Sequence, residues 1–148
     1  MSMRNLSIAL AACVGLLAAP SWAGGPEAMV YKSPTCGCCS KWIEHLEANG
    51  FEVKSEDRLD MATVKAENGV PTQMASCHTA IIDGYVIEGH VPAEDIARLL
   101  EQRPALSGLA VPRMPIGSPG MEGPNAERYQ VLGFDAEGGV VSYATHGP

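Results

Sequence analysis

The spacing of apolar residues changes along this chain, and each change marks a predicted element. Residues 28–32 form a short apolar run that predicts a strand. From position 36 to 49 the spacing becomes helical, carried by the apolar residues Cys39, Trp42, Ile43 and Leu46. Asn49-Gly50 tolerates the left-handed conformation that ends a helix. The sequence therefore predicts a strand followed directly by a helix.

Four further elements follow from the same patterns. Residues 51–54 alternate apolar and polar side chains, as a half-buried strand does. Asp60 can cap a helix from Met61 to about residue 68. Two apolar runs within residues 79–87 meet at Asp-Gly, which predicts a hairpin. Pro92 suits the first helical position of a further helix, which ends before Arg103-Pro104.

The C-terminal third of the chain has a different composition. Residues 104–124 contain five prolines and four glycines but also many apolar side chains. We expect a long ordered loop packed on the domain, without a helix or strand of its own, and such loops are often functional. Residues 128–134 and 139–144 then predict a second hairpin.

The N-terminus has the features of an export signal. Arg4 provides the positive region, residues 6–19 the apolar region, and Ser21 and Ala23 the small residues before cleavage. The apolar stretch is shorter than the roughly 20 residues of a transmembrane helix. A lipoprotein anchor at Cys13 is disfavoured, because cleavage there would divide the apolar run. The sequence thus predicts a cleaved signal peptide over 1–23 and a single exported domain over 24–148.

Charge narrows the range of partners. Loss of Arg4 leaves nine basic side chains against 17 acidic ones in the exported chain. Such a balance argues against nucleic acid and anionic membranes as partners, and it suits cations. We therefore expect neither nucleic-acid binding nor membrane association after signal cleavage.

Cysteine spacing carries the strongest functional signal. Cys36, Cys38 and Cys39 lie within four residues at the predicted strand-to-helix turn, where the helix dipole stabilises thiolate. With Cys77, the exported chain has four thiols. Two structural disulfides would require strained pairing inside the cluster, whereas Cys36 and Cys39 alone could form a redox CxxC bridge. The extra thiol of Cys38 would hinder disulfide exchange but would help to bind Cu(I), with zinc the next choice.

Other soft ligands could complete such a site. His90 precedes the last predicted helix, and Met114 and Met121 lie in the proline–glycine segment. Met74 and His78 are weaker candidates that rest on position alone. The remaining aromatic and imidazole side chains are expected to be structural: Trp42 in the core, His45 too far along the helix, and His146 exposed near the end of the chain.

The predicted order of elements, β-α-β-α-β-β-α with thiols at the first strand–helix junction, indicates a thioredoxin-like α/β fold. We expect a three-layer sheet with flanking helices, extended by the proline–glycine loop and the C-terminal hairpin. The redox-enzyme pattern is incomplete, because the loop before the first hairpin carries Cys77 where thioredoxins have a cis-proline. The nearest proline, Pro71, lies six residues earlier.

Taken together, these motifs resemble the CopG-type periplasmic copper-resistance family. The resemblance covers about residues 29–143 and rests on the segments YKSPTCGCC, SCHTA, GYVIEGHVP and MPIGSPGME. It implies a thioredoxin-like fold, a cysteine-bridged multinuclear copper site and an oxidoreductase role in copper detoxification. By matching motif, the ligands would be Cys36, Cys38, Cys39 and Cys77, with His90, Met114 and Met121 carried over less directly.

The leading hypothesis is a periplasmic Cu(I)-binding protein for copper resistance that could also cycle the metal between Cu(I) and Cu(II). Its partners would be copper ions and other periplasmic copper-handling proteins. Two alternatives stay open: a thiol–disulfide oxidoreductase using Cys36 and Cys39, and a non-catalytic copper chaperone. The number of copper ions bound per chain distinguishes the first hypothesis from the oxidoreductase.

Overall fold

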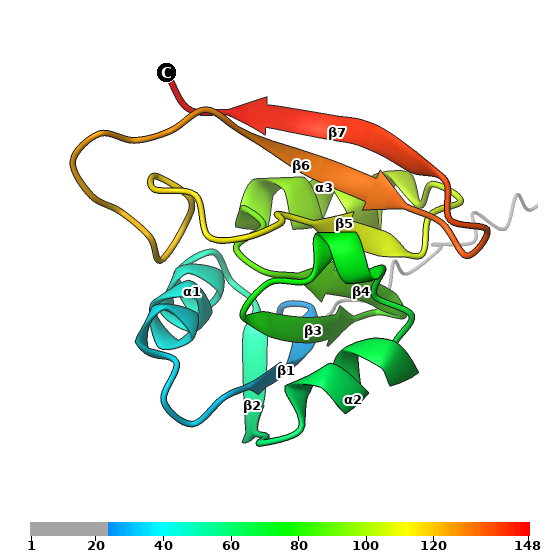
Figure 1. The fold of residues 1–148 in the computed structure, drawn as a ribbon, viewed down its shortest axis with the longest axis horizontal. Coiled ribbons are helices and arrows are strands. Elements are labelled where there is room, and N and C mark those ends of the chain that lie inside the picture. The colour runs from blue at the N-terminus through cyan, green and yellow to red at the C-terminus, as the bar shows by residue number, and fades with distance from the viewer. Residues whose placement is uncertain (1–23) are drawn as a thin grey trace, which may run out of the picture.

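A seven-stranded mixed sheet organises the chain, with strand order β2-β1-β3-β4-β5-β6-β7 (Figure 1). The computed structural model describes residues 24–148, so the predicted signal peptide and Cys13 lie outside the described residues. The strands are β1 (Glu27–Lys32), β2 (Glu52–Asp57), β3 (His78–Ile82), β4 (Tyr85–Glu88), β5 (Gly108–Ala110), β6 (Tyr129–Phe134) and β7 (Val140–His146). The helices are α1 (Gly37–Ala48), α2 (Met61–Glu67), the short 3₁₀ helix η1 (Thr72–Met74) and α3 (Ala93–Gln102).

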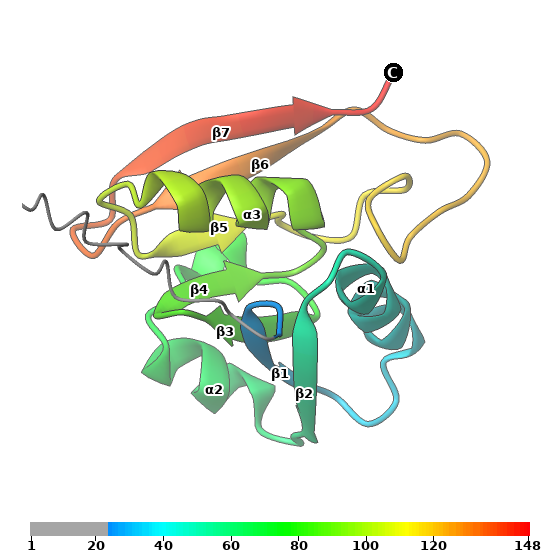
Figure 2. The same cartoon turned by 180° about the vertical axis from the view of Figure 1, so that it is seen from behind.

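Both faces of the sheet are covered by packed side chains. Helices α1 and α3 place Trp42, Leu46, Ile96 and Leu99 in the main core, against β1, β3 and β4. Figure 2 shows α3 lying across this face of the sheet. On the other face, α2 packs against β1 and β3, and a smaller core forms around Phe134. Alternate strand residues therefore face two separate apolar layers, as strand geometry requires.

Local sequence signals were reliable where they depended on near neighbours. The Asp-Gly pair makes the β3–β4 turn with positive φ at both residues, 48° at Asp83 and 85° at Gly84. This is the conformation that favours two-residue hairpin turns. The second predicted hairpin is also present as the antiparallel pair β6–β7. Pro92 precedes α3 as its N-cap instead of occupying its first turn.

One prediction about the proline–glycine segment was wrong. It contains a strand, β5, which pairs parallel with β4 and antiparallel with β6. Leu109 lies in the main core and Ala110 in the smaller one, so the strand is buried on both faces. Three residues are too few to show the alternation of side chains that identifies a strand. The first of them must be glycine, because a Cβ at Gly108 would lie 1.9 Å from the Val86 oxygen.

The expectation that His146 is exposed was also wrong. Its Nε2 lies 2.6 Å from the buried Asp95 carboxylate, and its ring stacks on Tyr129 with the centroids 5.4 Å apart. This contact joins the end of β7 to the start of α3. Sequence spacing could not reveal it, because the two partners are 51 residues apart.

The α/β class is confirmed by this sheet and its flanking helices, whereas the thioredoxin-like assignment stays a prediction. Within residues 24–148, no helix is both long enough and apolar enough to cross a lipid bilayer.

Candidate metal centre

The thiols and imidazoles singled out above meet beside the N-terminus of α1. Cys36 is the N-cap of that helix, and its N–H donates to Ser33 O over 3.1 Å. Cys77 precedes β3, and His90 lies between β4 and α3. The long segment between β5 and β6 passes alongside α1, as both ribbon views show (Figures 1 and 2). Four parts of the chain therefore contribute to one centre.

The sulfur atoms form a compact group. Cys36 and Cys39 are joined by a disulfide, and the free thiols among the described residues are Cys38 and Cys77. Cys38 Sγ lies 3.5 Å from Cys36 Sγ. All four Sγ atoms lie within 4.8 Å of one another. The structure thus brings the four predicted cysteine ligands together, with the CxxC pair in its oxidised form.

Two imidazoles complete the inner side of the centre. His78 and His90 are both fully buried. Cys77 Sγ lies 3.0 Å from His90 Nε2 and 3.4 Å from His78 Nδ1. His90 Nδ1 donates to Pro119 O over 2.7 Å, which leaves Nε2 with a free lone pair directed at Cys77. Pro119 belongs to the proline–glycine segment, so that segment fixes the His90 tautomer.

His78 is a residue that sequence analysis weighted too lightly. Trp42 covers its ring, with the centroids 4.3 Å apart, and Trp42 Nε1–H donates to Val91 O over 2.9 Å. Within the described chain, His78 Nε2 is a buried nitrogen without a hydrogen-bond partner. The signal that could have identified it is its place at the start of β3, where the hairpin sets it opposite the Gly89–His90 turn.

Burial sets the protonation states of His78, His90 and Cys77. It lowers the pKa of His78 well below its usual value, with His90 and then Lys65 adding to the effect. Burial also lowers the pKa of His90, partly offset by the Pro119 carbonyl. The pKa of the Cys77 thiol rises to about 12, first because of burial and then because of Cys38. Neutral imidazoles and a protonated thiol are therefore the resting forms, and a metal ion would displace the thiol proton.

The two candidate methionines differ in position. Met114 Sδ lies 3.8 Å from Cys38 Sγ, and its side chain is 45% exposed. Met121 lines an open hollow of about 640 Å³ beside Cys38 and Lys41. In the described structure we find no sulfur contact from Met121 to the cysteines. Met114 thus lies at the outer edge of the centre, and Met121 lies close by without joining it.

Met74, a weaker candidate, and His45, which was expected to lie too far along the helix, are both structural. Met74 is buried in the smaller core with Val70 and Phe134, so its thioether fills space. His45 Nε2 accepts a hydrogen bond from the Ala93 N–H over 3.0 Å, which ties α1 to the start of α3. Burial lowers the pKa of His45, consistent with this acceptor role.

A buried ion pair supports the loop that carries Cys77. The fully buried Glu88 accepts hydrogen bonds from Lys65 Nζ at 2.6 Å, from Thr79 Oγ1 at 2.7 Å and from the Ser76 N–H at 2.6 Å. The Ser76 hydroxyl donates to the Arg113 carbonyl oxygen. This network connects the residue before Cys77 to the residue before Met114. Sequence analysis missed it, although a glutamate that ends an apolar strand is an unusual feature.

Replacing Glu88 by Gln should destabilise the protein. The substitution leaves the partly buried Lys65 without a counter-charge, and breaking a buried pair from one side costs about 3 kcal/mol or more. Chemical denaturation should show a lower midpoint with an unchanged slope. Lys54→Gln is the matched control, because its ion pair with Glu27 is exposed and should contribute little to stability. Equal losses in the two variants would contradict a stabilising role for Glu88.

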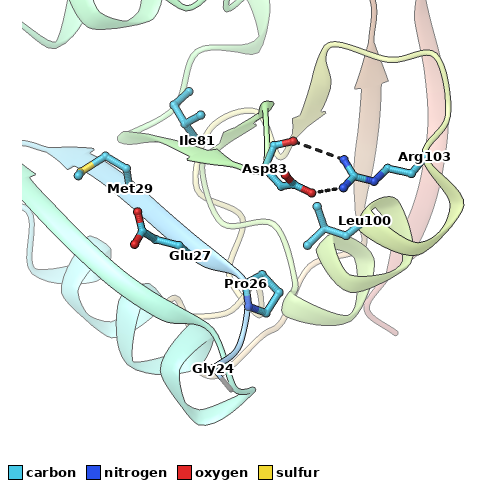
Figure 3. Close-up of a pocket in the computed structure, with 8 residues that line it drawn as sticks. All are labelled: Gly24, Pro26, Glu27, Met29, Ile81, Asp83, Leu100 and Arg103. Carbon is cyan, nitrogen blue, oxygen red and sulfur yellow. Dashed lines mark hydrogen bonds and ion pairs between the residues drawn. The ribbon is translucent and has the colours of Figure 1, made fainter. Parts of the chain in front are cut away.

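A second pocket, of about 580 Å³, lies near the N-terminal end of β1 and has a different character (Figure 3). Met29, Ile81 and Leu100 make it apolar, and an ion pair between Asp83 and Arg103 borders it. Its described lining contains no cysteine or histidine. This pocket therefore lacks the soft ligands that distinguish the centre at α1.

This arrangement defines a class: an α/β protein whose clustered thiols and buried imidazoles form a site able to hold a soft metal ion. Comparison with known proteins makes the assignment more specific. Residues 74–121 match a family described as "Protein of unknown function, DUF411". No sequence among the curated proteins matches the chain.

Two solved structures give the family. "Copper resistance protein copG", form 2, is 48% identical, with a TM-score of 0.79 over 83% of this chain and 99% of that one. Form 1 is also 48% identical, with a TM-score of 0.78 over 82% of this chain and 98% of that one. The chain belongs to the CopG copper-resistance family.

Proposed function

We propose that this protein acts in copper resistance by holding Cu(I) in a cysteine-bridged multinuclear site. The observation that carries the proposal is the convergence of four cysteine sulfurs within 4.8 Å of one another. Thiolates select Cu(I), and one thiolate can bridge two ions. Reduction of the Cys36–Cys39 disulfide makes all four sulfurs available as ligands.

The residues around the sulfurs would have distinct roles. His90 offers a neutral Nε2 already held by Pro119, the arrangement typical of a metal-ligating imidazole. Met114 offers a thioether at the outer edge, and Met121 a second one in the adjacent hollow. Thiolates favour Cu(I), whereas imidazoles also accept Cu(II). A site with both could therefore cycle copper between the two oxidation states.

The proposed location is the periplasm, where the signal over 1–23 would deliver the chain and where a disulfide can persist. The proposed partners are copper ions and other periplasmic proteins that pass copper on. The acidic net charge of −7 supports cations as ligands and argues against nucleic acid.

A thiol–disulfide oxidoreductase is the second candidate, and the closed Cys36–Cys39 bridge favours it. The position of Cys38 argues for copper instead. Its thiol lies 3.5 Å from Cys36 Sγ, where it could attack the bridge and scramble the pairing. In a copper site the same closeness is an advantage.

Copper counting tests the proposal. The exported protein is reduced, freed of reductant under argon, loaded with Cu(I) and desalted, and its copper is measured by mass spectrometry. We expect more than one copper per chain, because four thiolates can share ions. The matched control is Cys36→Ser with Cys39→Ser, which should hold no more than one. A reduced wild-type protein that binds no copper but exchanges one disulfide would instead establish the oxidoreductase.

A further inference from the structure

We propose that closing the Cys36–Cys39 disulfide changes the metal preference of this centre. In that form the chain would hold one borderline divalent ion, of the Cu²⁺ and Zn²⁺ class, at Cys77, His78 and His90. The inference deepens the proposed copper function. Only the statement that the reduced form holds Cu(I) rests on that function.

The three ligand atoms already stand close to binding geometry. They lie within 4.8 Å of one another, and Cys77 Sγ is 3.0 Å from His90 Nε2 and 3.4 Å from His78 Nδ1. Metal bonds of about 2.3 Å to sulfur and 2.0 Å to nitrogen put a tetrahedral S–N pair about 3.5 Å apart. The His78 pair meets this spacing, and the His90 pair needs to open by about half an ångström.

The surrounding structure holds the imidazoles in place without the disulfide-bonded cysteines. The β3–β4 hairpin fixes both histidines relative to each other, because the Gly89 N–H donates to His78 O over 3.0 Å. Pro119 O accepts a hydrogen bond from His90 Nδ1, and Trp42 covers the His78 ring. Such outer partners set the tautomer and orientation of metal-binding imidazoles.

The ligand set explains the change of preference. In the disulfide, Cys36 and Cys39 no longer provide thiolates, so a thiolate-bridged Cu(I) cluster loses two of its four sulfurs. Two imidazoles and one thiolate suit a borderline divalent ion, and sets of this kind hold both zinc and copper. Cys38, whose Sγ is within 4.8 Å of Cys77 Sγ, can supply a fourth ligand.

Electrons and protons balance in the switch between the two forms. A dithiol reductant gives two electrons and two protons to the Cys36–Cys39 bond, which becomes two thiols while the reductant becomes a disulfide. Binding of a divalent ion to the oxidised form releases one proton from Cys77 and changes no oxidation state.

Cobalt(II) is a suitable probe, because it takes the same ligands and does not oxidise thiols. Exported protein with the bridge closed, verified by alkylation of only two cysteines, is titrated with Co²⁺ under argon. We expect one Co²⁺ per chain, a sulfur-to-cobalt charge-transfer band and the strong visible bands of tetrahedral cobalt. Zn²⁺ should displace the cobalt and abolish the bands.

Variants assign the ligands. His90→Ala should weaken Co²⁺ binding at least about tenfold, the loss seen when even a supporting partner is removed. Cys77→Ser should likewise weaken Co²⁺ binding and diminish the charge-transfer band, leaving at most the contribution of Cys38. The matched control is Cys36→Ser with Cys39→Ser, which removes the bridge and the cluster but should keep full Co²⁺ binding. Circular dichroism identifies variants that fail to fold.

Two outcomes would overturn the inference. One is a folded oxidised protein that binds no Co²⁺, even if the reduced protein holds several Cu(I) ions. The other is Co²⁺ binding unaffected by either His90→Ala or Cys77→Ser. If the oxidised protein binds one Co²⁺ as expected while the reduced protein never exceeds one Cu(I), the multinuclear proposal fails and the inference stands.

Discussion

Cys38→Ser should reduce the copper content of the reduced protein to one ion per chain or fewer. Cys38 Sγ lies 3.5 Å from Cys36 Sγ and 3.8 Å from Met114 Sδ, so it links the inner sulfurs to the exposed thioether. Without it, three thiolates remain, and the proposed site loses the sulfur that lies between the other thiols and Met114. Copper per chain, measured after anaerobic desalting, would show the change.

The variant should leave the rest of the protein intact. Cys38 is in the first turn of α1 and partly exposed, so a serine of similar size adds no buried polar group. Cys36 and Cys39 should still form their disulfide. Ser40→Ala, an exposed change on the same helix, is the matched control and should keep the wild-type copper content. Full copper stoichiometry in Cys38→Ser would contradict the cluster and favour thiol–disulfide exchange.

Sequence patterns predicted elements whose signals are local. The α1 stripe of Trp42 and Leu46 and the Asp83-Gly84 turn depend on neighbours a few residues away. Strand β5 escaped notice because its three residues owe their conformation to pairing with β4 and β6. The β7–α3 contact through His146 and Asp95 likewise depends on parts of the chain that meet only after folding.

In the candidate site, too, features set by adjacent residues were predicted and features set by distant contacts were not. The cysteine spacing identified Cys36, Cys38 and Cys39 from adjacent residues, and the structure brings Cys77 to them. The spacing left open whether Cys36 and Cys39 form a bridge, which the structure shows. The motifs could not identify the groups that orient the candidate ligands, because the Pro119 carbonyl that orients His90 is 29 residues away along the chain.

Gly120 makes the docking of the proline–glycine segment on α1 testable. Its φ is +84°, and a Cβ there would lie 2.9 Å from both Cys38 O and Trp42 N. The loop therefore meets the backbone of the helix that carries the cysteines, and only glycine fits the contact. The preceding residue, Pro119, holds His90. Displacement of the loop would remove the hydrogen bond that fixes the His90 tautomer.

Gly120→Ala should consequently lower both stability and metal affinity. Left-handed backbone at a non-glycine residue costs about 1–3 kcal/mol, and the clash with α1 adds to that cost. Loss of the partner of a ligating imidazole typically weakens metal binding about 10- to 100-fold. Thermal unfolding and competition with a Cu(I) chelator would measure the two effects separately.

The matched control lies three residues further along the same loop. A Cβ at Gly123 would meet only Ile116, at an ordinary 3.5 Å, so Gly123→Ala should change neither property. If the two variants behave alike, the loop does not depend on close contact with α1. His90 would then owe its orientation to the β3–β4 hairpin alone. A specific loss in Gly120→Ala would instead show that the proline–glycine segment is part of the metal centre, although it contributes there mainly through its backbone.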